Sequence, residues 1–291
     1  MYSMPLFSIV IPVFNRESLV CSTLDAVMMQ EFKDFEIILV DDGSIDDVKN
    51  KLSSYIDAGA IKYYYQTNTG VSAARNKGAS FSKAEYLIFL DSDDSVTENW
   101  LLEYANMIKK SNPDIIYCGI NRLKKNILVE YTDPSNPYKD GKSFGNVIPG
   151  SFCIKSEFFK TIGGYDDKLA YGENTELGFR IKMASPTTAF IRSPNLIYNL
   201  HENSHGKNVR NKLNGIIYTI NKHPKLFKNN KEMKRRFLSI AGVAAISINE
   251  RTRARELFWK AWKLSPLNFI MLLRLLFSLS PFISKKIWVN K

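Results

Sequence analysis

The chain has 291 residues, of which 45% are hydrophobic and 24% charged, an ordinary composition for a folded protein that buries a full core. Its three cysteines, odd in number and without metal-ligand spacing, argue against a disulfide scaffold and suit a reducing cytosol. The net charge of +11 is concentrated in residues 206–291, where 19 Lys and Arg oppose 3 Asp and Glu. This asymmetry argues against a uniformly basic surface that binds nucleic acid.

The N-terminal part of the chain alternates apolar runs with helix-like segments. No basic segment precedes the first run, so we expect a strand there and not a signal peptide. Strands are expected to begin near Phe7, Glu36, Ile61 and Tyr86, with helices between them over residues 16–30, 46–56 and 71–82. This alternation predicts βαβ units and a mostly parallel sheet with helices on both faces.

Polar residues follow all four expected strands, and in open α/β sheets the carboxyl ends of the strands form the ligand-binding edge. These residues are Asn15 and Arg16, Asp41 to Ser44, Asn68 to Gly70, and Asp91 to Asp94. The second group could be only a turn with a helix N-cap. The third could be a loop before a surface helix, although Arg75 and Lys77 also offer cations to a phosphate there.

The segment Tyr86–Asp94, YLIFLDSDD, is the most informative of these. Five apolar residues typical of a strand buried on both faces run directly into three carboxylates. Close like charges repel unless they are neutralised, and a divalent cation that also binds a phosphate would neutralise them. A solvated loop after the strand is the simpler alternative. The other polar strand ends favour the metal and phosphate site.

Four motifs in this order resemble those of the family-two glycosyltransferases with the GT-A fold. They are SIVIPVFN at residues 8–15, EIILVDDGS at 36–44, NTGVSAARNKG at 68–78 and YLIFLDSDD at 86–94. The resemblance covers residues 6–205. It implies a nucleotide-sugar donor, usually a UDP-sugar, with Mn2+ or Mg2+ bound at a D-x-D motif, and it does not indicate which sugar.

The resemblance also implies roles for the matching residues. Those expected around the base and ribose are Pro12, Phe14, Asn15, Asp41, Asp42 and Asn68, with one of the two aspartates accepting from the uracil N3–H. Arg75 would face the diphosphate. Asp91 and Ser92 would lie on the nucleotide side, and Asp93 would be the direct metal ligand. A cation and Arg75 would then stabilise the charge that grows on the leaving UDP.

The second part of the chain carries the acceptor-side resemblance. We expect a helix over residues 98–110, followed by an apolar run over 114–120 and a long loop over 131–145. The segments GGYDD at 163–167 and YGENTEL at 171–177 resemble the family's acceptor segment, in which the Asp after Glu is usually the general base. Here that position is Asn174, and an amide does not take up a proton near neutral pH.

Three explanations of Asn174 stay open. Glu173 or Glu176, three residues apart at the start of an expected helix, could serve as the base, and we favour Glu173. Alternatively, Asn174 orients the acceptor while Asp166 or Asp167 takes the proton. In the third explanation the protein is a poor or inactive transferase.

Two of the chain's three histidines lie in YNLHENSH at residues 198–205. This segment resembles the family's Y-x-x-H-x-x-S element, whose His can reach the metal. His201 fits that spacing and His205 is the second candidate. A solvent-exposed histidine on a loop is the simpler alternative.

The C-terminal part departs from the sheet pattern. Residues 207–223 and 231–263 show helical patterning with basic residues interleaved among apolar ones. The apolar run FIMLLRLLFSLSP at 269–281 contains Arg274 and is shorter than the ~20 residues that a membrane span needs. It is better suited to a helix lying on an anionic membrane surface. A helical cap on the main domain and an oligomer interface are the alternatives.

We therefore predict an α/β protein with a GT-A (Rossmann-like) mixed, mostly parallel sheet, helices on both faces and a helical basic C-terminal segment. The expected parts are a nucleotide-sugar-binding part over 1–95, an acceptor-binding part over 96–205 and a C-terminal region over 206–291.

The expected activity is metal-dependent transfer, with inversion, of a hexosyl or N-acetylhexosaminyl group from a UDP-sugar. The acceptor would be a hydroxyl of a glycan or lipid-linked glycan, in bacterial capsule, exopolysaccharide or O-antigen assembly. We expect a cytoplasmic protein, peripheral on the inner face of the cell membrane, and leave a homo-oligomer open. The alternatives are a nucleotide-sugar-binding protein with little transferase activity and a basic interaction module acting through residues 206–291.

Overall fold

The computed structural model describes residues 4–135, 147–200 and 208–279. The chain forms two compact units. The first comprises residues 1–168 and 173–202, and the second comprises residues 169–172 and 203–291. Each unit has its own hydrophobic core, so the two are described separately.

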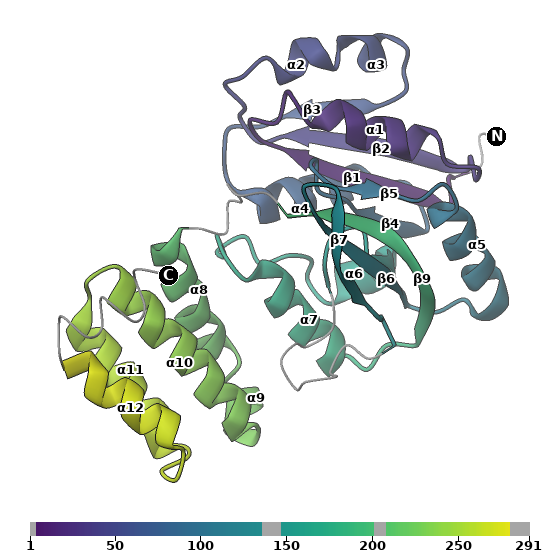
Figure 1. Ribbon diagram of the computed structural model, residues 1–291. Coiled ribbons are helices and arrows are strands. Elements are labelled where there is room, and N and C mark those ends of the chain that lie inside the picture. The colour runs from purple at the N-terminus through teal and green to yellow at the C-terminus, as the bar shows by residue number, and fades with distance from the viewer. Residues whose placement is uncertain (1–3, 136–146, 201–207, 280–291) are drawn as a thin grey trace. The chain divides into compact units, whose positions relative to one another are not determined.

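The first unit is built on one sheet, in which the described strands follow the order β3-β2-β1-β4-β8-β6-β9-β5, with β7 paired to β6 (Figure 1). The four strands expected from the sequence are confirmed as β1 (Phe7–Val13), β2 (Phe35–Asp41), β3 (Lys62–Tyr65) and β4 (Tyr86–Phe89). They run parallel, with β1 between β2 and β4. The remaining strands are β5 (Ser95–Val96), β6 (Ile115–Lys124), β7 (Ile127–Thr132), β8 (Phe152–Lys155) and β9 (Thr188–Asn199).

The antiparallel strand β8 joins the two parallel parts of the sheet, because it pairs with β4 on one side and with β6 on the other. β6 and β9 are parallel to each other, and the short β5 pairs antiparallel with β9. The sheet is therefore mixed and mostly parallel, as predicted. This arrangement brings the ends of β4 and β9, far apart in the sequence, to the same region.

Helices cover both faces of the sheet. They are α1 (Val20–Met28), α2 (Val48–Lys51), α3 (Ser53–Asp57), α4 (Val71–Phe81), α5 (Trp100–Ser111), α6 (Ser156–Thr161) and α7 (Glu173–Met183). Successive side chains of a strand point to opposite faces. Ile9 and Ile11 of β1 accordingly pack in the cluster with α1 and α5, whereas Val10 packs in the cluster with α4, α6 and α7. Burial on both faces explains why β1 is apolar except at Ser8, whose hydroxyl donates a hydrogen bond to Glu36.

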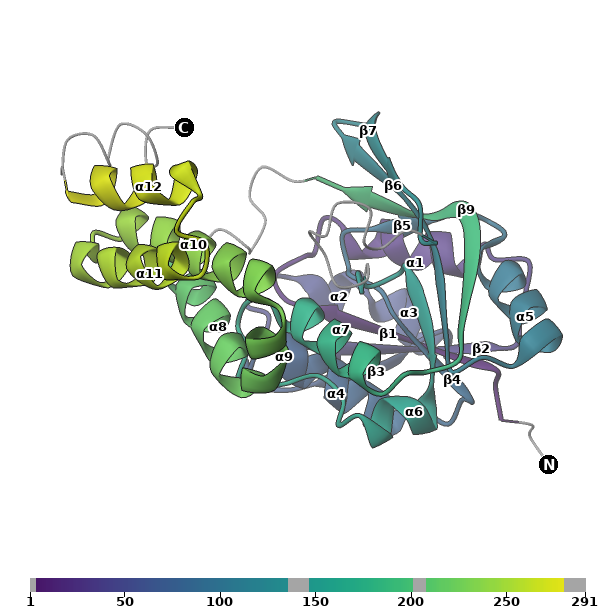
Figure 2. The same ribbon diagram turned by 90° about the horizontal axis from the view of Figure 1, so that it is seen from below.

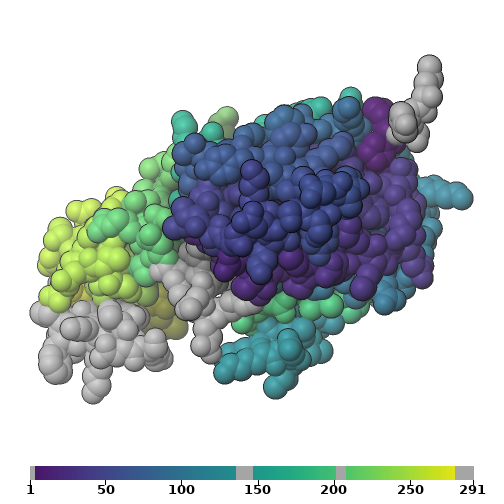
Figure 3. All heavy atoms as spheres, turned by 90° about the horizontal axis from the view of Figure 1, so that it is seen from above, coloured from purple at the N-terminus to yellow at the C-terminus, as the bar shows by residue number. Residues whose placement is uncertain are grey.

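The β6–β7 hairpin extends beyond the other strands of the first unit (Figure 2). Its two turn residues, Lys125 and Asn126, have φ values of 50° and 62°, as in the two-residue turns that match the twist of paired strands. The hairpin also protrudes, in teal, in the space-filling view of Figure 3. β7 takes up the start of the loop expected over residues 131–145, and residues 136–146 lie outside the described part of the chain.

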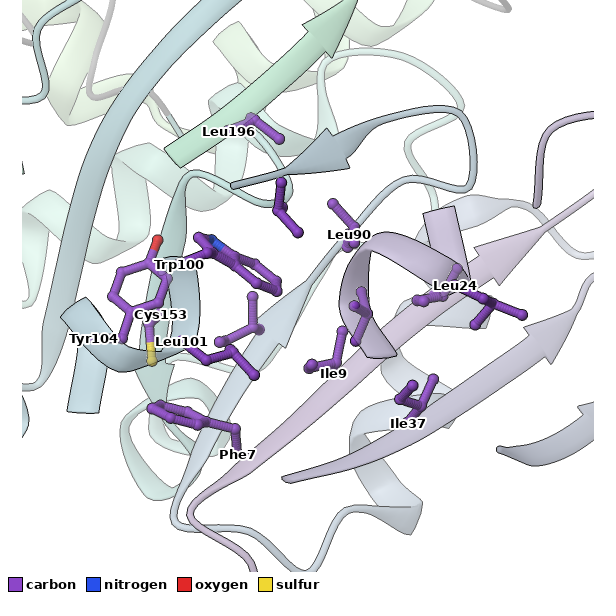
Figure 4. Packing of buried hydrophobic residues seen from close by; sticks show 14 of the residues in the cluster. Phe7, Ile9, Leu24, Ile37, Leu90, Trp100, Leu101, Tyr104, Cys153 and Leu196 are labelled. Atoms are coloured by element: carbon purple, nitrogen blue, oxygen red, sulfur yellow. The ribbon is translucent and has the colours of Figure 1, made fainter. Parts of the chain in front are cut away.

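The larger core cluster includes the aromatic side chains Trp100 and Tyr104 of α5 (Figure 4). Trp100 and Tyr104 are fully buried, and Trp100 donates from Nε1 to the carbonyl of Gly150 at 2.9 Å. Leu90, directly after β4, and Leu196 of β9 belong to the same cluster. The core therefore fixes the chain immediately before the Asp91–Asp94 segment and immediately before the end of β9.

Gly78 lets α4 lie close to the sheet, because a Cβ at this position would collide with the buried Val10 side chain of β1. We expect Gly78→Ala to lower the free energy of unfolding by about 1–3 kcal/mol through overpacking, despite the higher helix propensity of Ala. Denaturant unfolding, with the exposed Ser80→Ala of the same helix as control, measures this effect. Unchanged stability in Gly78→Ala would show that α4 can shift without cost.

The second unit is helical, as predicted. Its helices are α8 (Val209–Lys222), α9 (Pro224–Asn229), α10 (Lys231–Ser247), α11 (Arg251–Lys263) and α12 (Phe269–Leu279). Their core is made mainly of residues from α8, α10 and α11 and includes Met271 of α12. In the ranges that the structure describes, no helix is both long and apolar enough to cross a membrane.

Candidate active site

The ends of β1 and β2 are linked through Asn15 and Ser44. Asn15 has a φ of 51°, its backbone N–H donates to Ser44 Oγ at 3.0 Å, and its Oδ1 accepts from the N–H of Ile45 at 2.9 Å. Asp41 accepts from the N–H of Ser44 at 2.8 Å and from the Tyr63 hydroxyl at 2.6 Å. These contacts hold the first two polar strand ends in one place.

Asp42 fixes the loop between β3 and α4. Its two carboxylate oxygens accept from the N–H groups of Thr69 and Gly70, each at 2.9 Å, and Oδ1 also accepts from Gln66 Nε2 at 2.8 Å. At Gly43, where φ is 78°, a Cβ would lie only 2.7 Å from the backbone nitrogen of Asn68. The structure thus brings together the six residues expected around the nucleotide base and ribose, with Pro12 buried, Phe14 half-buried and Asn68 exposed.

Asp91, Ser92, Asp93 and Asp94 follow β4 at the same edge. Asp93 Oδ2 lies 3.4 Å from Arg16 Nη2, and both side chains are 21% exposed. Ser92 is buried. Arg16 follows Asn15 in the sequence, so the end of β1 supplies a cation to the end of β4. The sequence interpretation noted Arg16 as a polar residue at this edge but did not place it in the site.

Asp94 is buried and is held by β9. Its Oδ1 accepts from the backbone N–H of Asn199 at 2.9 Å, and Asn199 Nδ2 donates to the carbonyl of Asp93 at 3.0 Å. Oδ2 of Asp94 is buried without a hydrogen-bond partner among the described residues. Burial raises the pKa of Asp94 well above its ordinary value, and the negative charges of Asp91 and Asp93 raise it further. Burial and the neighbouring carboxylates therefore disfavour the charged form of Asp94, and a bound cation would oppose this effect.

Arg75 of α4 links the two sides of the site. Its side chain is only 2% exposed, and its Nη2 contacts Asp91 Oδ1 at 2.6 Å while its Nη1 contacts Glu173 Oε1 at 3.3 Å. The guanidinium also lies over the Tyr165 ring, 5.0 Å from its centroid. Burial opposes the charge of Arg75, but Asp91, Tyr165 and Glu173 together raise its pKa above the ordinary value. Arg75 is therefore a buried cation between two carboxylates.

The sequence interpretation placed Arg75 at a diphosphate, whereas both terminal nitrogens of its guanidinium contact carboxylates in this structure. Its Nε is buried without a partner among the described residues. The neighbouring Asn76 exchanges two hydrogen bonds of 2.8 Å with the backbone of Tyr165. Consecutive residues of α4 thus contact Tyr165 and Glu173, and contact between Arg75 and a phosphate stays a prediction.

The first turn of α7 carries the three residues expected to be catalytic. Glu173 faces Arg75, as described above. Glu176 is fully buried, and both of its carboxylate oxygens accept from Arg180 one turn further along, with a shortest contact of 2.7 Å. Asn174 lies between them, and its Oδ1 is buried without a hydrogen-bond partner in the described structure. Glu173 is therefore joined through Arg75 to Asp91, whereas Glu176 is paired with Arg180.

The described residues could hold a cation only together with further ligands, such as the oxygens of a diphosphate. No group of three or more His, Cys, Asp or Glu side chains within the described ranges could hold a metal ion. The carboxylates at Asp91–Asp94, with Asp94 Oδ2 buried and without a partner among the described residues, nevertheless suit a cation that brings anionic ligands of its own, as a diphosphate would. The predicted ligand His201 and the second candidate His205 lie outside the described residues.

Residues 8–161, slightly more than half of the chain, match the model of glycosyl transferase family 2. The chain therefore belongs to this family of glycosyltransferases, as its four strand-end motifs predict.

Two curated relatives illustrate the similarity. An uncharacterized glycosyltransferase of Rickettsia typhi is 32% identical over 192 residues, which cover 62% of this chain and 60% of that protein. The cholesterol galactosyltransferase of Borreliella burgdorferi is 34% identical over 173 residues, which cover 56% of this chain and 47% of that protein. The match thus spans about half to three fifths of these relatives' length.

Among solved structures, S. aureus TarS in complex with UDP-GlcNAc superposes with a TM-score of 0.68 and 16% identity, over 95% of this chain and 88% of that chain. S. aureus TarS in complex with UDP gives a TM-score of 0.59 at 16% identity, covering 96% of this chain and 90% of that chain. At these identities the likeness concerns the fold alone, and it confirms the predicted GT-A architecture.

Proposed function

We propose that this protein transfers a sugar from a UDP-sugar to an acceptor hydroxyl, with inversion and with the help of a divalent cation. One observation supports the proposal above the others. Arg75 joins Asp91, on the expected donor side, to Glu173, on the expected acceptor side, although Asp91 and Glu173 are more than eighty residues apart in the sequence. A glycosyl transfer site needs these two sides next to each other, because the acceptor must approach the sugar carbon that the diphosphate leaves.

The donor would lie along the edge formed by β1 to β4. The base and ribose would contact Pro12, Phe14, Asn15, Asp41, Asp42 and Asn68, and Asp91 and Ser92 would lie on the nucleotide side. TarS binds UDP-GlcNAc and UDP, which supports a donor of this class for a chain with the same fold. Asp93, with His201 as the expected second protein ligand, would hold Mn2+ or Mg2+ together with diphosphate oxygens. Such a cation, when bound, stabilises negative charge on the leaving UDP.

On the acceptor side, the hydroxyl oxygen forms a bond to the anomeric carbon while the bond from that carbon to the diphosphate oxygen breaks. The attack comes from the side opposite the leaving group, so the anomeric configuration inverts. Glu173 takes the hydroxyl proton in our proposal, since Asn174 cannot and Glu176 is buried against Arg180. The partnerless Oδ1 of Asn174 would accept a hydrogen bond from the acceptor and orient it.

Replacing Glu173 with Gln tests the assignment of the base. Gln can still accept from Arg75, so we expect a thermal midpoint close to that of the parent protein but a kcat about 10²–10⁴-fold lower. UDP release in the presence of acceptor measures kcat. Asn174→Asp is the matched variant, because it restores the family's usual carboxylate and is expected to keep or raise kcat. Full transfer by Glu173→Gln would show that another group takes the proton.

A second candidate function is binding of a nucleotide-sugar without appreciable transfer, which the amide at position 174 favours. This candidate predicts that the protein binds UDP in the presence of Mn2+ but releases no UDP from any donor, with or without acceptor. Calorimetry of UDP binding alongside a UDP-release assay distinguishes the two functions.

We further propose that the acceptor is a growing lipid-linked glycan, as in bacterial capsule, exopolysaccharide or O-antigen assembly, and that the second unit contacts the inner face of the cell membrane. Its positive charge and the exposed Leu267, Phe269 and Ile270 support this contact. Phe269→Ser with Ile270→Ser should lower the sedimentation of the full chain with anionic vesicles, whereas Met29→Ser, at an equally exposed position, should not. Equal sedimentation of both variants would contradict the proposal.

A further inference from the structure

The tip of the β6–β7 hairpin, residues 123–129, exposes an unusual group of aliphatic side chains. Ile127, Leu128 and Val129 are 68%, 54% and 53% exposed. Within the described part of the sheet, β7 pairs only with β6, so its outer edge faces away from the other described strands. Single exposed apolar residues are common on protein surfaces, but three consecutive ones at a protruding turn indicate a contact surface.

The hairpin tip is apolar on both faces. Ile127 and Leu128 are successive residues of β7, so their side chains point to opposite faces. In the strand register Ile127 is opposite Lys124 and Leu128 is opposite Leu123. Val129 has no register partner in β6, because the pairing shifts between Arg122 and Leu123. A groove of a protein partner would cover one face of the tip and leave the other in water. The acyl layer of a lipid bilayer, in contrast, would surround both faces.

The charge of the tip indicates what surrounds it. Lys124 and Lys125 precede the aliphatic residues. The acidic residue nearest to the tip in the sequence, Glu130, forms an ion pair with Arg122 at 3.5 Å. The tip therefore carries positive charge. Residues 1–205 as a whole are net negative, with 21 Lys and Arg against 26 Asp and Glu. Lysines beside apolar side chains suit an anionic lipid surface, because their alkyl stems can lie in the apolar layer while the ammonium groups reach the headgroups.

We propose that the hairpin tip inserts into the surface of an anionic lipid bilayer. The three aliphatic residues extend over about 10 Å at ~3.3 Å per residue, which matches the ~5–10 Å to which interfacial segments enter the headgroup–acyl boundary. This contact belongs to the first unit and is separate from the one proposed for the second unit. It does not depend on the proposed transferase activity.

The location of the tip gives the contact a function. Asn199 pairs with Leu123 at the base of the tip, and the same Asn199 holds Asp93 and Asp94 through its side-chain and backbone nitrogens. A bilayer that contacts the tip would therefore be linked to the candidate active site through Asn199. If the acceptor is lipid-linked, this contact would place the acceptor's headgroup next to the donor.

A fluorescent label at the tip tests the contact directly. Cys118 and Cys153 are buried, so Leu128→Cys in a Cys21→Ser background accepts a single environment-sensitive label. We expect vesicles of equal parts phosphatidylcholine and phosphatidylglycerol to raise the emission severalfold and shift it to shorter wavelength. Vesicles of phosphatidylcholine alone should give a smaller change. Met29→Cys, at a position that is 70% exposed on the same unit, is the matched control and should give none.

Substitutions give a second readout in the full chain. Ile127→Ser with Leu128→Ser should lower the vesicle partition coefficient at least about tenfold. Lys124→Glu with Lys125→Glu should reduce the preference for phosphatidylglycerol, to which the basic second unit also contributes. An unchanged emission at position 128 while the protein sediments with vesicles would overturn the proposal, as would a failure to sediment at all. A change that depends on protein concentration without vesicles would identify a second copy of the chain as the occupant instead.

Discussion

Asp93→Asn is expected to lower UDP release at least about 10³-fold, because a catalytic cation contributes several kcal/mol of charge stabilisation to the transition state. The substitution keeps the size of the side chain and removes the charge that would bind the cation. The fold should tolerate it, since the ion pair between Asp93 and Arg16 is partly exposed and such pairs contribute ~1 kcal/mol or less. Steady-state rates over a range of Mn2+ concentrations measure the effect.

Arg16→Gln is the control for this experiment, because it removes the same ion pair and leaves the carboxylate of Asp93 in place. We expect this variant to keep most of its Mn2+-dependent rate. An unchanged rate in Asp93→Asn would exclude Asp93 from cation binding. An equal loss in both variants would mean that the ion pair, and not the cation, accounts for the effect.

Arg75→Met is expected to be strongly destabilising. It leaves Asp91 and Glu173 without their shared cation, and breaking a buried ion pair from one side costs about 3–5 kcal/mol. For a unit of this size, that loss corresponds to a decrease of about 10 °C in the thermal midpoint. The variant should also lose transfer activity, because Glu173 is then no longer oriented. Calorimetry and rates measured well below the midpoint separate the two effects.

Arg180→Met is the matched control for the Arg75 variant. It breaks another buried ion pair of the same region, that with Glu176 on α7, without touching Asp91 or Glu173. We expect a lower thermal midpoint in this variant but a kcat close to that of the parent protein. If Arg75→Met keeps its kcat at a temperature where it is folded, Arg75 stabilises the fold and does not position the base.

The convergence of the polar strand ends at one edge of the sheet could be predicted from the sequence, because the signals there are local. The apolar runs of β1, β2 and β4 end directly in Asn15, Asp41 and Asp91, and a parallel sheet brings such ends to one edge. The helical C-terminal unit was likewise visible from its periodicity. In both cases the pattern of a short segment was sufficient.

The contacts between distant segments could not be predicted from the sequence. Arg75 and Glu173 are 98 residues apart, and no local pattern shows that they form a pair. Burial of Asp94 by the end of β9 depends on the crossover that places β9 beside β6. A helix pattern also does not show that Glu176 is buried in the interior while Glu173 contacts Arg75 of another helix. These features follow from tertiary packing.

The strand β7 was missed for a different reason. Its residues Ile127–Thr132 are largely exposed, so they lack the alternation of buried and exposed positions that marks a strand. The hairpin forms through its two-residue turn at Lys125 and Asn126 and its pairing with β6, which the hydrophobic pattern does not show.

A screen of UDP-sugars for Mn2+-dependent release of UDP tests the central claim most directly. Parent protein and Asp93→Asn are incubated with each donor, with and without a chelator, and free UDP is quantified. We predict that the parent protein releases UDP from at least one donor, that the chelator stops the release, and that Asp93→Asn releases none above background. Binding of UDP without release from any donor, or release that the chelator and the substitution leave unchanged, would contradict the proposed metal-dependent transfer.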